Sequence, residues 1–284
     1  MARPDGTPGW QRPGATALPC LRYCCRFVVL GSAAGTPAGH VDYHFVSNPQ
    51  LFMRIAVLSD IHANLPALLA VLRKLDTLPH DRVISLGDQV GYGPHPNEVI
   101  DILRERNIPT VLGNHDAGVV GRISLGMFRE PNHSLLAWTR DHLTGENREY
   151  LMRAPLTMEE DNWIAAHASP IEPEQWTYLN SAPLCRKVLS QIPHTFCLVG
   201  HTHVPGVIPD RIGVFRVKPG HRFVINPGSI GQPRDSSRLA SFGILDTEAG
   251  SWDHHQVAWP RSETLEGFER LGVDDQTAAQ LLFF

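Results

Sequence analysis

Residues 53–64 read Met-Arg-Ile-Ala-Val-Leu-Ser-Asp-Ile-His-Ala-Asn. The apolar run within residues 54–59 is typical of a strand that is buried on both faces. It leads into Asp60 and His62, two side chains that can bind metals, and Asn64 can cap the helix that the spacing of the next apolar residues predicts. A buried strand that passes through polar ligands into a helix is the opening unit of an α/β fold. We therefore expect the folded domain to begin at Met53.

The same unit recurs twice along the chain. Residues 82–86 form a second predicted strand, which ends in Gly87-Asp88 and precedes a Gly- and Pro-rich loop and another amphipathic helix. The apolar run 109–112 reads as a third buried strand, and it ends in Gly113-Asn114-His115-Asp116. The order strand, helix, strand, helix, strand predicts a parallel core and the α/β class.

Residues 117 to about 153 break this order and predict a small helical insertion near the strand ends. One helix is expected from Pro131 to Leu143, and a second is expected near residues 148–152. Further strands are expected at residues 162–166, 195–199, 222–225, 240–246 and 255–259, the last two as a closing antiparallel hairpin.

Composition separates residues 1–52 from the rest, because they are rich in Pro, Gly, Ala and Arg and lack periodic patterning. Residues 26–34 faintly resemble a signal peptide, but their apolar core is too short and the lead-in contains Pro. We interpret residues 1–52 as a disordered extension or as translated sequence upstream of the native start. The predicted domain then covers residues 53–259, and residues 260–284 form a helical tail.

The charge and cysteine content of the chain limit its environment. A net charge of −4 gives no basic footprint for nucleic acid. The five cysteines form no regular framework, which favours a reducing compartment and a cytoplasmic location. No apolar run approaches the roughly 20 residues that a membrane-spanning helix needs.

The predicted strand ends together present a set of oxygen and nitrogen ligands. In open α/β sheets, ligands bind beyond the carboxyl ends of the strands. A set without thiolates favours Mn²⁺, Fe or Zn²⁺, and it is too large for one ion. Two divalent ions accommodate it: the first would be held by Asp60, His62 and His203, the second by Asn114, His167 and His201, and Asp88 would lie between them.

The blocks of this set, in chain order, are Asp60-Ile61-His62, Gly87-Asp88, Gly113-Asn114-His115-Asp116, His167 and Gly200-His201-Thr202-His203. This pattern resembles the calcineurin-like metallophosphoesterase superfamily. Its finer features are similar to the small prokaryotic phosphodiesterase branch, including Ser59–Asn64, Gly87–Pro94, His167–Pro170 and Asn226–Ser229. The resemblance covers roughly residues 53–259, and it implies an α/β fold of two packed mixed β-sheets flanked by helices.

The resemblance also implies a dinuclear centre, with manganese favoured, that hydrolyses a small phosphodiester or phosphomonoester. A metal-bridging hydroxide would attack phosphorus in line, and His115 would protonate the leaving group as general acid. Asn114 would bind both a metal and a phosphoryl oxygen. Asp116 is expected to orient the His115 imidazole, and Asn226 is expected to shape the substrate site.

Several of these residues have simpler interpretations. Asp116 could cap the following helix, Asn226 could only form a turn, and Tyr92 could belong to the core rather than face substrate. We expect His95, His133 and His142 at the surface, and Trp138 and Trp163 in packing.

Other functions within the same superfamily remain open. A dinucleoside-polyphosphate hydrolase is compatible with the blocks. A protein phosphatase should carry Gly-Asp-x-x-Asp-Arg-Gly, whereas Asp88 is followed by Gln-Val-Gly-Tyr-Gly. A nuclease should have a basic region, and a non-catalytic binding module should have lost ligands, yet none is missing. The expected partner is a small phosphate ester, without a membrane or nucleic acid, and the oligomeric state is left open.

Overall fold

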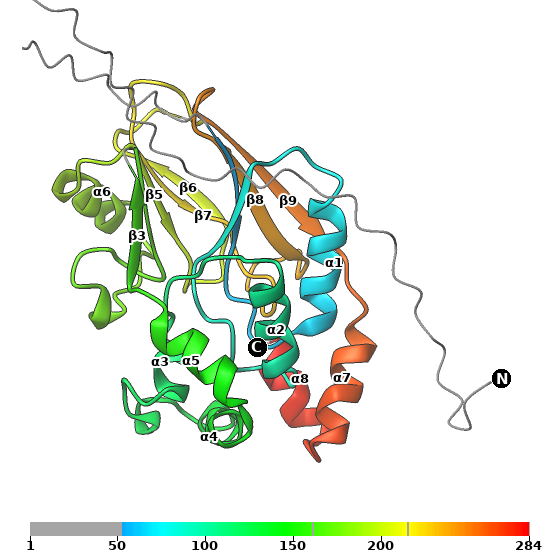
Figure 1. Ribbon diagram of the computed structural model, residues 1–284. Coiled ribbons are helices and arrows are strands. Elements are labelled where there is room, and N and C mark those ends of the chain that lie inside the picture. Colours follow the sequence, from blue (N-terminus) through cyan, green and yellow to red (C-terminus); the bar gives the residue numbers. More distant parts are fainter. Residues whose placement is uncertain (1–52, 161, 215, 284) are drawn as a thin grey trace, which may run out of the picture. The chain divides into compact units, whose positions relative to one another are not determined.

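The computed structural model describes residues 53–160, 162–214 and 216–283, so the predictions made for residues 1–52 lie outside the described part of the chain. The described residues form an α/β unit with two mixed β-sheets flanked by helices (Figure 1), as predicted. In the parts that the structure describes, no helix combines the length and apolarity required to span a bilayer.

The first sheet has the strand order β2-β1-β8-β9. Strands β1 (Arg54–Leu58) and β2 (Arg82–Ser85) are parallel, as the sequence predicts. Strands β8 (Ala240–Asp246) and β9 (Ser251–Val257) form the expected antiparallel hairpin, which pairs with β1. The second sheet has the order β3-β4-β5-β7-β6, with β4 (Trp163–Ala166), β5 (Phe196–Val199) and β7 (Phe223–Asn226) parallel. Its edges are the antiparallel strands β3 (Thr157–Glu160) and β6 (Gly206–Pro209).

The alternation of side chains along the strands builds three layers of core. Ile55 and Val57 of β1 face the second sheet, where they join Leu198 and Ile225 in one buried cluster. The intervening Ala56 and Leu58 face helices on the other side of the first sheet. The outer face of the second sheet packs in the same way on α6 (Ala182–Gln191). Both faces of β1 and β5 are therefore covered, which explains their continuous apolar runs.

Helices α1 (Leu65–Leu75) and α2 (Pro96–Glu105) follow β1 and β2 as expected. The insertion contains α3 (Asn114–Val119), a short 3₁₀ helix (Leu125–Met127), α4 (Asn132–His142) and α5 (Gly145–Arg153). The two longest of these agree with the predicted insertion helices. A second 3₁₀ helix covers Pro173–Gln175.

The predicted tail is helical and is packed into the main core. It forms α7 (Arg261–Arg270) and α8 (Asp275–Phe283), and Asp274 caps α8 by accepting from the Thr277 N–H at 3.0 Å. Phe268 and Leu281 are buried in the cluster that covers the first sheet. The side chains of this segment thus contribute to the same core as α1.

The strand predicted at residues 109–112 is not a regular strand in the structure. The run 109–112 makes only an isolated bridge, between Thr110 and Ser85. The Leu112 N–H turns away from β2 and donates to Pro155 O at 2.7 Å, so the ladder stops. Strands β3 and β6 and helix α6 were not predicted.

Candidate metal centre

The predicted ligands meet where the parallel strands of the two sheets end. Asp60 and Asp88 lie on the loops after β1 and β2, and His167 directly follows β4. His201 and His203 lie on the loop after β5, and Asn114 begins α3. Six of these side chains are at most 5% exposed: Asp60, His62, Asp88, His167, His201 and His203. Polar and ionisable side chains that are buried together in this way are stable only when each has a hydrogen-bond, charge or metal partner.

Two neighbouring groups of side chains have the spacing of metal ligands. In the first, His203 Nε2 lies 3.2 Å from Asp60 Oδ1 and 3.0 Å from His62 Nε2. In the second, His167 Nε2 lies 3.2 Å from Asp88 Oδ2 and 3.1 Å from His201 Nδ1. Within each group the ligand atoms lie within 4.8 Å of one another. The structure therefore brings together the two sets that the sequence predicts.

Two further distances extend and connect the groups. Asn114 Oδ1 lies 3.1 Å from His167 Nε2, so the amide oxygen joins the second group. Asp88 Oδ2 also lies 3.8 Å from His62 Nε2, which belongs to the first group. Asp88 is accordingly the carboxylate between the two groups.

Backbone carbonyls determine how three of the imidazoles face the centre. The Nδ1 atoms of His62, His167 and His203 lie 2.7–3.0 Å from the carbonyl oxygens of Val90, Leu86 and Gln232. A carbonyl oxygen only accepts, so each Nδ1 carries a proton, and each ring in its neutral form presents the Nε2 lone pair. The His62 and His203 lone pairs then face one another at 3.0 Å, an arrangement that suits a shared cation. The residues present therefore fit divalent metal ions.

The pKa values of the buried carboxyl and imidazole groups at the centre are shifted by burial and by one another's charges. Burial opposes ionisation of Asp60 and Asp88, but the surrounding histidines outweigh it and hold the pKa of both carboxyls below its usual value. Burial also opposes protonation of His167, yet the adjacent Asp88 raises its pKa to about 9. Burial lowers the pKa of His62, well below its usual value, and that of His201, to about 3. The buried carboxylates thus create a field that attracts positive charge.

The backbone at the centre is held in an uncommon conformation. Five of the predicted ligands are non-glycine residues with φ between 51° and 65°: Asp60, His62, Asp88, His201 and His203. Such left-handed geometry costs about 1 kcal/mol or more per residue and persists where the surrounding packing imposes it. Its concentration here supports a functional centre.

Close backbone packing explains the glycine in the block Gly113-Asn114-His115-Asp116. A Cβ atom at Gly113 would overlap Asp88 Oδ1 and Asp88 N. A Cβ atom at Gly200 would overlap Ser59 Oγ and approach Asp60 Oδ2 at 2.5 Å. Both loops can therefore approach the carboxylates only because these residues lack a side chain.

His115 lies beside the two groups. Its backbone N–H donates to Asp88 Oδ1 at 2.9 Å, while its ring Nε2 lies 3.9 Å from Asp88 Oδ2. His62, Asp88 and His115 also satisfy ligand spacing, so the ring is within reach of a metal. Among the described residues, its Nδ1 has no hydrogen-bond partner. Burial lowers the pKa of His115 to about 4.

Asp116 does not orient the His115 ring, contrary to expectation. Its Oδ1 accepts from the N–H groups of Gln89 and Val90 at 2.9 and 3.2 Å, and its Oδ2 accepts from the Gly113 N–H at 3.1 Å. Burial, together with Asp88, raises the pKa of Asp116 to about 7. Asp116 therefore joins the loop after β2 to the start of α3. This arrangement agrees with the expectation that Asp116 could cap the following helix.

Asn226, which is expected to shape the substrate site, makes its hydrogen bonds within the loops behind the centre. Its Nδ2 donates to Gly200 O at 2.7 Å and to Thr202 Oγ1 at 3.0 Å, and its Oδ1 accepts from the Gly228 N–H at 2.8 Å. The side chain is 7% exposed and lies behind the loop that carries His201 and His203. Its amide therefore supports that loop.

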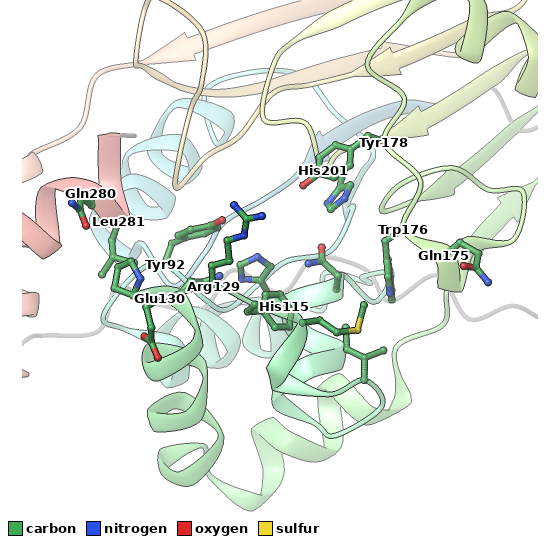
Figure 2. Close-up of a pocket in the computed structure, with 16 residues that line it drawn as sticks. Tyr92, His115, Arg129, Glu130, Gln175, Trp176, Tyr178, His201, Gln280 and Leu281 are labelled. Atoms are coloured by element: carbon green, nitrogen blue, oxygen red, sulfur yellow. The ribbon is translucent and has the colours of Figure 1, made fainter.

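A cavity of about 680 Å³ opens over the centre (Figure 2). Asn114, His115 and His201 contribute to its lining. Tyr92 also lines it and packs against His62 and His115, with ring centroids 4.7 and 4.8 Å apart, so Tyr92 faces the cavity. None of His95, His133 and His142 is among the lining residues; His142 is exposed, as expected, whereas His95 is half-buried. Trp163 is buried between the sheets, and Trp138, a residue of α4, packs against the cluster that covers the first sheet, also as expected.

Much of the cavity lining was missed by sequence reasoning. It comes from Ile123 and residues 127–132 of the insertion, from Gln175, Trp176 and Tyr178, and from Gln280 and Leu281 of α8. Tyr178 stacks on His201 with ring centroids 3.8 Å apart, and Phe128 meets His115 edge to face at 5.0 Å. The sequence offered one signal for these lining residues, namely the expectation that the helical insertion lies near the site.

The two-sheet fold and the Asp, Asn and His set at its strand ends define the class of metallophosphoesterases. The calcineurin-like phosphoesterase superfamily domain matches residues 53–250, and the chain belongs to this family.

Relatives of the chain come from bacteria and archaea. An uncharacterized protein of Methanocaldococcus jannaschii is 39% identical over 202 residues, which are 68% of this chain and 82% of that protein. A crystal structure of a metallophosphoesterase from Sphaerobacter thermophilus is 34% identical, with a TM-score of 0.69 over 81% of this chain and 98% of that one. A hypothetical protein from Pyrococcus horikoshii, 20% identical over 81% of this chain and 97% of its own, shares the fold with a TM-score of 0.69.

Proposed function

We propose that this protein is a dinuclear metal-dependent phosphoesterase that hydrolyses a small phosphodiester, with His115 as the proton donor to the leaving group. One observation carries the proposal: two groups of ligand atoms, each within 4.8 Å, lie side by side with Asp88 between them. His115 is adjacent to both, and Asn114, His115 and His201 line one cavity. Family membership supports phosphoester hydrolysis as the reaction class.

In this proposal Asp60, His62 and His203 hold one divalent ion, and Asn114, His167 and His201 hold the other. Asp88 contributes to both sites. When bound, the ions would lower the pKa of a water molecule and draw negative charge from the phosphoryl oxygens. We favour manganese because the ligand set contains only oxygen and nitrogen, which Mn²⁺ accepts.

His115 supplies the proton that the leaving alkoxide needs. Its Nε2 points toward the centre, and its Nδ1 has no partner among the described residues that would hold the ring in one tautomer. An anionic phosphodiester beside the ring would favour the imidazolium form and so oppose the effect of burial. Asp116 and Asn226 act through the loops that they hold, without touching substrate.

A diester suits the cavity better than a simple monoester. Aromatic side chains lie on both sides of the centre, with Tyr92 and Phe128 beside His115 and with Trp176 and Tyr178 beside His167 and His201. A phosphodiester has two substituents, and each would find an apolar surface.

The proposal is tested with bis-p-nitrophenyl phosphate and p-nitrophenyl phosphate after chelation and after restoring Mn²⁺, Fe²⁺ or Zn²⁺. We expect the diester to be turned over only with metal and faster than the monoester. If neither ester is hydrolysed with any of the three ions, the protein is not the enzyme proposed. Faster hydrolysis of the monoester would reverse the preference for a diester.

A further inference from the structure

The cavity wall beside His115 carries a positively charged side chain, that of Arg129, which has no role in the proposed reaction. This insertion wall consists of Met127, Phe128 and Arg129. The Arg129 side chain is exposed and extends into the cavity, whereas Glu130 points away from it (Figure 2). The wall therefore presents a guanidinium group toward the space above the centre.

The side chain of Arg129 has no partner among the described residues. Within the described residues, no hydrogen bond, ion pair or ring contact joins its side chain to another residue. The neighbouring carboxylate of Glu130 lies 3.1 Å from His133 Nδ1 and accepts from the Ser134 N–H at 3.2 Å. By contrast, Arg234 donates to Gln232 Oε1 at 2.9 Å and lies 3.4 Å from the Tyr92 hydroxyl. An uncommitted arginine that lines a cavity is suited to an anionic group on a ligand.

The same side of the cavity has aromatic surface. The ring centroid of Phe128 lies 5.0 Å from that of His115, and the ring centroid of Tyr92 lies 4.8 Å from that of His115. A planar ring on the ligand can pack against such side chains. The surroundings of His115 thus combine a proton donor, aromatic surface and one cation.

The position of His115 identifies which part of the substrate meets this wall. If His115 protonates the leaving oxygen, the groups around it contact the leaving alcohol, so this inference rests on the proposed function. Gln280 and Leu281 of α8 also line the cavity. Its volume of about 680 Å³ lies within the range of about 300–1,000 Å³ that is typical of small-molecule sites, which favours a short substrate over a polymer.

We propose that the leaving alcohol carries both an aromatic ring and a second anionic group that pairs with Arg129, as in a linear dinucleotide with a terminal 5′-phosphate. Water forms the new bond to the internal phosphorus, the bond from phosphorus to O3′ breaks, and O3′ takes the proton from His115. One dinucleotide and one water give two nucleoside 5′-monophosphates. The nucleotide that leaves through O3′ carries the 5′-phosphate recognised by Arg129.

The test compares three substrates on the full-length, Mn²⁺-loaded protein: the 5′-phosphorylated diadenylate pApA, the same dinucleotide without that phosphate (ApA), and bis-p-nitrophenyl phosphate. We expect kcat/KM to be about tenfold higher for pApA than for ApA, as one charge-assisted contact would give. Arg129→Gln should remove this difference and leave the other two substrates within about twofold. Arg153→Gln is the matched control, since Arg153 is an exposed arginine outside the cavity that pairs with Glu149; it should change none of the three.

A binding measurement supplies a second readout that does not depend on turnover. AMP and adenosine are titrated calorimetrically into the full-length protein with and without Mn²⁺. AMP should bind more tightly than adenosine in both states, and Arg129→Gln should weaken only AMP. Equal affinities for AMP and adenosine would remove the proposed phosphate contact.

The outcomes separate this inference from the proposed function. Turnover of bis-p-nitrophenyl phosphate without any preference for pApA would overturn the inference and leave the phosphodiesterase intact. An equal loss on all three substrates in Arg129→Gln would assign Arg129 to the reacting phosphoryl group instead. Absence of metal-dependent turnover of all three would overturn the proposed function itself.

Discussion

The floor and the wall of the cavity are built in different ways. The floor consists of the seven proposed ligands Asp60, His62, Asp88, Asn114, His167, His201 and His203, and all but Asn114 are buried. The wall is made of Ile123, residues 127–132, 175, 176 and 178, and residues 280–281; Met127 is 69% and Tyr178 45% exposed, whereas Leu281 is buried. Buried polar groups with left-handed backbone permit few substitutions, whereas an exposed wall permits many. The floor should therefore determine the reaction, and the wall should determine the substrate.

The largest effect is expected from the carboxylate between the two ligand groups. Asp88→Asn keeps the shape of the side chain but removes its charge, so it should lower kcat for bis-p-nitrophenyl phosphate on the order of a thousandfold with saturating Mn²⁺. Circular dichroism should show an unchanged fold. Retention of more than a tenth of the activity would show that Asp88 is dispensable to the floor.

The next largest effect is expected at the proposed proton donor. His115→Asn should lower kcat by about 10²–10⁴-fold while Mn²⁺ affinity stays close to that of the wild type. A substrate with a better leaving group than p-nitrophenol should recover part of the rate, because it needs the proton less. Wild-type kcat in this variant would remove His115 from the role of general acid.

A backbone change in the floor should have a smaller effect. Gly113→Ala brings a Cβ atom into overlap with Asp88, so Asp88 or the start of α3 must shift. We expect kcat/KM to fall about 10–100-fold, which is typical of changes that displace a metal ligand through its neighbours. Gly145→Ala is the matched control, because a Cβ atom there meets nothing within 4 Å. Equal kinetics for the two variants would contradict the tight packing described for the floor.

The smallest effect on catalysis is expected from the wall contributed by α8. Leu281→Ala truncates a buried side chain and should destabilise the protein by about 2–5 kcal/mol in urea unfolding, but it should change kcat by less than about threefold. Leu265→Ala, at a position 37% exposed, is the control and should cost well under half as much. A loss of kcat comparable to that of Gly113→Ala would show that the wall takes part in the chemistry.

The floor could be predicted from sequence because its residue types are dictated by chemistry. A strand end that holds a metal needs Asp, Asn or His, and the close approach of two loops needs Gly113. The β1-α1-β2-α2 order at the start of the described chain follows from apolar runs and helix caps in the same way, as with Asn64, which accepts from the Ala67 N–H at 3.3 Å.

The wall could not be predicted, since its position depends on long-range packing. Trp176 and Tyr178 follow a 3₁₀ helix without a periodic pattern, and Leu281 reaches the cavity only because α8 packs on the first sheet. The short edge strands were missed for related reasons: β3 has the sequence Thr-Met-Glu-Glu, and β6 contains both Gly and Pro. The contacts of Asp116 and Asn226 could not be predicted, because partners such as the Gly113 and Gly228 N–H groups become neighbours only through the folded loops.

The central claim, a dinuclear floor whose metals do not depend on His115, is tested most directly by counting bound Mn²⁺. Full-length protein is stripped with a chelator and titrated calorimetrically, in parallel with His115→Asn and Asp88→Asn. We predict about two Mn²⁺ per chain for the wild type and for His115→Asn, and fewer for Asp88→Asn. A stoichiometry of one or none in the wild type, or the loss of an ion in His115→Asn, would contradict the account.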